Sequence, residues 1–175
     1  MKMKNLLLKS FLLVSALGIF SNGFTQTCPE GMISYWRLEE STGTVFADEN
    51  GIHDATAVSS SPVQTTGISG RAQFFNGSSS NFLSVADHSA FDWAGTSSFS
   101  IELWVKYSGT GATEVFIGRD DPSSPVHWWI GTTSTGKIEW YTRTSDGADG
   151  DVVTTNSYND GAWHHIVCLL YTSDA

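Results

Sequence analysis

The amino-acid sequence predicts an all-β fold, an antiparallel sandwich of two sheets. Beyond the first 25 residues no apolar pattern of helical period occurs, and short segments of alternating apolar and polar residues recur. Clusters of Gly, Ser, Thr, Asp and Asn separate these segments. Short alternating strands with such turn residues between them are typical of antiparallel sandwiches. The remaining length is that of one average domain of about 100 to 150 residues, so we expect a single core.

Residues 1–25 are predicted to be a secretory signal peptide. Three lysines precede an apolar run over residues 11–20, and small residues after the run offer a cleavage site. A membrane-spanning helix is the alternative, but it needs about 20 consecutive apolar residues, which this run does not supply. We therefore expect a secreted protein, not inserted in a membrane, whose folded domain covers residues 26–171.

The clearest strand is predicted over residues 99–107. Its odd-numbered positions are all apolar or aromatic, and its even-numbered positions include Ser100, Glu102 and Lys106. A period of two indicates a strand with one buried face. Weaker strands are expected over residues 33–38, 72–75, 82–85, 115–118, 152–155 and 163–170. Residues 56–70, rich in Ser and Thr, are expected to form a long surface connection.

Residues 126–131 and 137–143 are predicted to pair as a hairpin, because a short turn segment rich in Ser, Thr and Gly joins them. A turn centred on Ser134 divides the side chains between two faces. The apolar face, expected in the core, pairs Ile130 with Ile138 and Trp128 with Trp140. The other face, expected outside, pairs Trp129 with Glu139 and His127 with Tyr141.

The outer face of this hairpin is the predicted carbohydrate-binding site. Sugars bind to exposed aromatic rings that are flanked by groups able to hydrogen-bond hydroxyls. The predicted site consists of His127, Trp129, Glu139, Tyr141 and Arg143. The alternatives are that loops outside this sequence cover the face, or that it packs against a neighbouring domain.

The chain is acidic, with 18 Asp and Glu residues against 9 Lys and Arg residues and a formal net charge of −9. Nucleic acid and anionic membranes are therefore not expected as partners. The same acidic surface favours solubility and offers oxygen ligands to hard cations such as calcium.

Five local patterns follow one another along the chain. Residues 31–40 combine a short apolar run with Tyr-Trp and an acidic turn, and residues 48–55 form a loop rich in Asp and Gly. Residues 70–77 read Gly-x-Ala-x-x-Phe-Asn-Gly, and strand patterns lie at 99–106 and 163–167. In this order they resemble the laminin-G-like domains of secreted bacterial multidomain proteins. The resemblance implies a concanavalin A-like lectin/glucanase jelly roll.

The sequence departs from this family near its C-terminal end. After the strand pattern at 163–167 the family continues into a turn and a strand resembling Tyr-Val-Asp-Gly, which residues 168–175 do not match. The resemblance therefore implies a jelly roll without its last strand, with residues 172–175 as a doubtful tail. It also implies that the strand around Trp36 has unpaired backbone groups.

One turn is a candidate calcium site. Asp48, Asn50 and the backbone carbonyls up to His53 form a turn of oxygen donors, and the resemblance brings Asn76 near them. Calcium takes about six to eight oxygen ligands. The alternative is an Asx turn without an ion. A second acidic loop, residues 146–151, is expected to be a solvated turn.

Catalysis is not expected. The related glucanases place carboxylates along one strand as Glu-x-Asp-x-x-Glu, and the sequence contains neither this run nor a Gly-x-Ser-x-Gly nucleophile elbow. The adjacent His164 and His165 should point to opposite faces of a strand, so they cannot hold one metal ion together. Cys28 and Cys168 could pair, but two thiols make no disulfide scaffold.

The predicted function is that of a secreted, non-catalytic binding module, stabilised by calcium, whose partner is a glycan or an extracellular protein. Further domains of the same polypeptide are expected beside it. Two alternatives stay open. One is a structural or adhesive spacer of a surface protein, and the other is an accessory domain of a polysaccharide-degrading enzyme.

Overall fold

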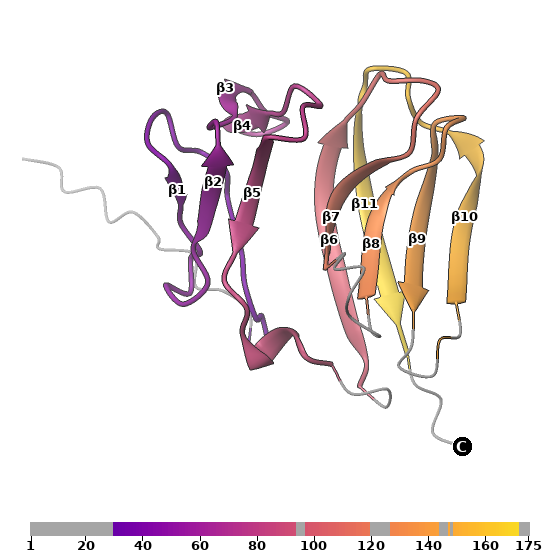
Figure 1. The fold of residues 1–175 in the computed structure, drawn as a ribbon, viewed down its shortest axis with the longest axis horizontal. Helices are drawn as coiled ribbons and strands as arrows, with labels where there is room; N and C mark the ends of the chain where they lie inside the picture. Colours follow the sequence, from indigo (N-terminus) through magenta and orange to yellow (C-terminus); the bar gives the residue numbers. More distant parts are fainter. Residues whose placement is uncertain (1–29, 94–96, 120–126, 144–146, 148, 172–175) are drawn as a thin grey trace, which may run out of the picture.

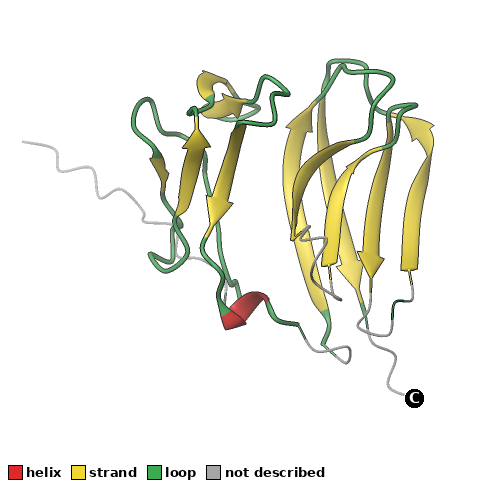
Figure 2. Ribbon diagram, in the orientation of Figure 1, coloured by secondary structure: helices red, strands yellow, loops and turns green. Residues whose placement is uncertain are grey.

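The computed structural model describes residues 30–93, 97–119, 127–143, 147 and 149–171. Within these residues the secondary structure is almost entirely β (Figure 2). The strands are β1 (Val45–Phe46), β2 (Ala55–Ser59), β3 (Val63–Thr66), β4 (Arg71–Phe74), β5 (Asn81–Val85), β6 (Phe99–Lys106), β7 (Glu114–Arg119), β8 (His127–Thr132), β9 (Lys137–Arg143), β10 (Asp149–Ser157) and β11 (Trp163–Leu170). A short 3-10 helix, η1, covers Ser89–Phe91. The all-β fold class predicted from the sequence is confirmed.

The strands form two groups, with β1 to β5 on one side of the molecule and β6 to β11 on the other (Figure 1). In the second group a four-stranded sheet of order β10-β9-β8-β7 faces the two-stranded sheet β11-β6. In the first group the order is β1-β2-β5, and β3 pairs with β4. All of these pairings are antiparallel.

The apolar core lies between the two facing sheets of the second group. Its buried residues are Ile130, Ile138, Trp140, Ile166 and Cys168, and partly buried side chains of β6 and β7 pack against them. The odd-numbered residues of β6 belong to this packing, as the alternation over residues 99–107 predicts. Because alternate residues of a strand share a face, an alternation of apolar and polar residues is enough to give each sheet an apolar inner face.

The hairpin of β8 and β9 keeps its predicted faces, but the predicted pairing is wrong. Ile130 lies opposite Trp140 and Trp129 opposite Tyr141. The reason is the turn, where the Gly136 N–H donates to the Thr133 carbonyl and Gly136 has a φ of 77°. This left-handed residue moves the centre of the turn one position beyond Ser134. Each partner moves by two positions, which preserves the face of every side chain.

Two predictions for the N-terminal group are also wrong. The strand expected over residues 33–38 is reduced to a single bridge between Trp36 and Asp48, and Leu38 has a φ of 59°, outside the extended region. The surface connection expected over residues 56–70 contains most of β2 and all of β3. Thr and Val in these strands favour β structure, and the Ser and Gly residues around them hid that pattern.

Candidate functional site

The outer face of the β7 to β10 sheet carries a row of aromatic rings. Trp129 and Tyr141 stack at 5.6 Å between ring centroids, with an angle of 20° between their planes. His127 stacks on Tyr141 at 5.5 Å and 30°. Both larger rings are half-buried, so part of each ring faces solvent, whereas His127 is only 7% exposed. His127 therefore supports Tyr141 from one side and does not itself offer an open face.

Polar groups surround this aromatic row. The Tyr141 hydroxyl donates to Asp149 Oδ1 at 2.7 Å, and Arg143 Nε lies 3.3 Å from the same oxygen. These two contacts fix the tyrosine ring and the guanidinium relative to each other. The structure thus brings the five residues of the predicted carbohydrate site to one sheet face. It adds Asp149 from β10, which the hairpin pattern could not have identified because β10 lies outside the hairpin.

Glu139 and Asp151 are the two further carboxylates of this face. By register, Asp151 lies opposite Tyr141, and Glu139 lies one pleat further along β9. Burial and the nearby charge of Asp151 raise the pKa of the Glu139 carboxyl above its usual range. The face is therefore acidic on the β10 side of the rings.

On the β7 side, Trp129 lies next to a glycine, which has no side chain. Gly118 of the edge strand β7 lies opposite Trp129 and is exposed. A Cβ at Gly118 would come within 2.6 Å of Trp129 Cβ. The glycine therefore leaves room for the indole and continues the open surface to the edge of the sheet.

The turn at Asp48 is organised around a buried carboxylate. Its Oδ1 accepts the backbone N–H groups of Tyr35 at 2.8 Å and Asn50 at 3.3 Å. Its Oδ2 accepts those of Ile52 at 3.4 Å and His53 at 3.1 Å. Burial alone would raise the pKa of Asp48, but the four N–H bonds together lower it below its usual range.

This donor arrangement does not fit a calcium ion at Asp48. A carboxylate offers about four lone-pair sites, and four backbone donors already use them. The Asn50 amide nitrogen donates to the Met32 and Ile33 carbonyls, and His53 Nδ1 lies 2.7 Å from Ser34 Oγ.

Asn76 belongs to a different turn, in which its Oδ1 accepts the Ser78 N–H. Among the residues that the structure describes, no group of three or more His, Cys, Asp and Glu side chains is arranged to hold a metal ion. The calcium site stays a prediction. Residues 146 and 148 of the acidic loop expected at 146–151 lie outside the described residues. The expected turn is wrong for Asp149, Gly150 and Asp151, which begin strand β10 because they pair with the end of β9.

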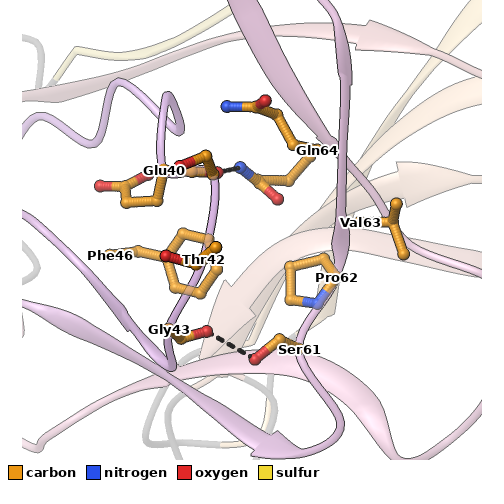
Figure 3. A pocket seen from close by; sticks show the side chains of 10 residues that line it. Glu40, Thr42, Gly43, Phe46, Ser61, Pro62, Val63 and Gln64 are labelled. Atoms are coloured by element: carbon orange, nitrogen blue, oxygen red, sulfur yellow. Dashed lines mark hydrogen bonds between the residues drawn. The ribbon is translucent and has the colours of Figure 1, made fainter.

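A hollow of about 400 Å³ lies between the segments 40–46 and 61–64 (Figure 3). The Ser61 hydroxyl donates to the Gly43 carbonyl at 2.8 Å across one end of it. The Gln73 amide nitrogen donates to the Glu40 carbonyl, also at 2.8 Å. Phe46 is 2% exposed and offers no ring face. Because the hollow has no accessible aromatic ring, we assign the candidate site to the outer face of the β7 to β10 sheet.

The two adjacent histidines point to opposite faces, as predicted. His165 stacks on Trp104 at 4.7 Å and hydrogen-bonds Glu102 on the outer face of β6 and β11. His164 faces the other way and lies 2.8 Å from Asp160. Cys168 is buried and free, and burial raises the pKa of its thiol. Cys28 lies outside the described residues.

Comparisons with known proteins agree with this architecture. Residues 75–174 match a laminin G family model described as the concanavalin A-like lectin/glucanases superfamily. An S-layer domain-containing protein from Clostridium thermocellum, known from a crystal structure, is similar to the chain with a TM-score of 0.55. The two are 18% identical, and the similarity covers 78% of this chain and 67% of that one. At this identity the likeness shows the fold alone.

None of the curated proteins compared with the chain matches it. In the described part of the chain, no helix has the length and apolar character required to cross a membrane.

Proposed function

This chain belongs to the concanavalin A-like lectin/glucanases superfamily, and we propose that it is a secreted, non-catalytic module that binds glycans. The observation that carries the proposal is the aromatic row on the outer face of the β7 to β10 sheet. Trp129 and Tyr141 are nearly parallel and partly exposed, and polar groups lie beside them. Aromatic platforms with flanking hydrogen-bonding groups suit the apolar faces and the hydroxyls of sugar rings.

Four further observations support this role. The acidic chain disfavours nucleic acid as a ligand, and the lysines and apolar run at the N-terminus fit secretion. The Clostridium thermocellum neighbour is named an S-layer domain-containing protein, which is consistent with a module of a surface protein. The sequence offers no Glu-x-Asp-x-x-Glu run for glycoside hydrolysis.

The proposal is tested by replacing one ring. Trp129→Ala should weaken binding to immobilised polysaccharides at least about fivefold, because an aromatic contact is worth on the order of 1 kcal/mol or more. Unfolding stability should change by less than about 1 kcal/mol, because the ring lies outside the core. Binding is measured on a glycan array and stability by urea unfolding.

Trp104→Ala is the matched control, since Trp104 is 48% exposed on the outer face of the other sheet. It should leave glycan binding unchanged. If the unmodified chain binds no glycan on the array, or if Trp129→Ala binds as well as the unmodified chain, this face is not a glycan site. The structural spacer then becomes the better description.

A further inference from the structure

The charges around the aromatic row are arranged unevenly. Three carboxylates lie on the outer face beside the rings, and strand register places them as neighbours: Asp149 opposite Arg143, Asp151 opposite Tyr141, and Glu139 one pleat away. Burial, together with the nearby charge of Asp151, raises the pKa of the Glu139 carboxyl, so Asp151 disfavours a negative charge at Glu139. An anionic ligand group placed above Tyr141 would meet the same repulsion.

Few cations offset these carboxylates. Among the described residues of this face, the guanidinium nearest the rings is that of Arg143, and it is held 3.3 Å from Asp149. Lys137 lies at the opposite end of β9, next to the 133–136 turn. A sulfate or uronate group stacked at the rings would therefore have to displace Asp149 from Arg143 to gain a partner.

The open path across the sheet runs along one row of the register. Asp151, Tyr141, Trp129 and Gly118 lie side by side on four neighbouring strands. Gly118 is exposed and has no side chain, so the row ends at a glycine on the edge strand β7. A chain molecule lying across the strands would thus stack on both rings and pass Asp151 at one end.

We propose that the outer face selects neutral glycan chains and rejects sulfated or uronate-bearing chains, through the repulsion exerted by Glu139 and Asp151. The inference rests on the proposed function, because it names the class of glycan that the aromatic row binds. It draws on charge placement, whereas the proposed function draws on ring stacking. The selectivity can therefore fail while the proposed function stands.

The experiment uses an array of matched polysaccharides. A neutral glucan, a neutral mannan and a neutral galactan are immobilised beside the sulfated form of each. The full chain at pH 7 should bind at least one neutral member about tenfold more tightly than its sulfated form, as like-charge contacts at several ångströms imply. Raising the salt concentration should narrow this ratio, because ions screen exposed charges.

A double variant, Glu139→Gln with Asp151→Asn, tests the cause. Its neutral-to-sulfated binding ratio should fall below about threefold, since both repelling charges are removed. Glu102→Gln is the matched control on the other sheet and should leave the ratio as it is. Circular dichroism of each variant verifies folding.

The outcomes separate the two ideas. Equal or tighter binding of the sulfated forms, lost in Trp129→Ala, would overturn the selectivity while the glycan site stands. An unchanged ratio in the double variant would also overturn the inference. Absence of binding to every neutral and sulfated member would remove the proposed function and the selectivity together.

Discussion

The two strand groups of this molecule are stabilised in different ways. The group from β6 to β11 surrounds an apolar cluster in which Ile130 is fully buried and Trp140 is 9% exposed. In the group from β1 to β5, polar residues are prominent among the buried side chains, which include Asp48, His53 and Asn81 as well as Phe46 and Ala55. Hydrogen bonds to buried polar side chains therefore stabilise the group from β1 to β5, whereas apolar packing stabilises the group from β6 to β11.

The difference teaches where each group is vulnerable. An apolar cluster loses stability in proportion to the volume removed from it. A polar turn instead depends on every donor having an acceptor, because an orphaned buried N–H costs about 1–3 kcal/mol. One substitution at Asp48 removes four acceptor contacts at once.

The largest effect is expected in the apolar cluster. Trp140→Ala should lower the free energy of unfolding by about 3–5 kcal/mol, because it leaves a cavity between the two sheets. Trp140→Phe should cost clearly less, since it keeps a ring against Phe99 and removes a buried indole N–H that has no partner. Urea unfolding followed by fluorescence measures both. The two-sheet core would be refuted if Trp104→Ala proved more damaging than Trp140→Ala.

A somewhat smaller effect is expected at the polar turn. Asp48→Ala should cost about 2–3 kcal/mol, because several backbone N–H groups lose their acceptor and solvent reaches only part of the turn. Amide hydrogen exchange should accelerate at Tyr35 and His53, whose N–H groups bond to Asp48, and much less at Ile166 in the core. Equal acceleration at all three amides would mean that the two groups do not respond separately.

The pH dependence of the turn sharpens the same comparison. The pKa of Asp48 is lowered in the folded protein, so its ionised form contributes stability that is present above the unfolded pKa of about 4. This stability is lost as pH falls below that value through the folded pKa. Thermal melting between pH 7 and pH 3 should therefore show a smaller acid destabilisation in Asp48→Asn than in the unmodified chain. If the melting temperatures of both proteins fell equally with pH, the acid sensitivity would belong to titratable groups other than Asp48.

The smallest effect is expected from calcium. Because the lone pairs of Asp48 are used by backbone donors, millimolar calcium should leave the melting temperature unchanged relative to a chelator. Binding at 100 times the dissociation constant would instead stabilise the fold by about 2.7 kcal/mol. A calcium-dependent rise in melting temperature that disappears in Asp48→Ala would establish the site expected from the sequence.

Much of the C-terminal group could be predicted from the sequence. The alternation over residues 99–107 and the two tryptophan-rich segments assigned side chains to faces correctly, because successive strand residues point to opposite sides of a sheet. Of the residues predicted for the core from β8 and β9, Ile130, Ile138 and Trp140 are in it. The prediction is wrong for Trp128, which lies outside this cluster, is half-buried and stacks on Trp93 at 5.3 Å. The N-terminal group was less predictable, because its strands are short and its buried side chains are polar.

The sequence by itself determined the strand periods, the faces of the hairpin and the acidic character of the chain, since these depend on neighbouring residues and on composition. Only the tertiary structure decided that Trp129 lies opposite Tyr141, that β10 adds Asp149 and Asp151 to the aromatic row, and that Asp48 is occupied by backbone donors. These features join segments that are distant in the chain or depend on the φ of one turn glycine. A local pattern fixes which face a side chain occupies, but the partner across the sheet is fixed by the turn and by strands from elsewhere in the chain.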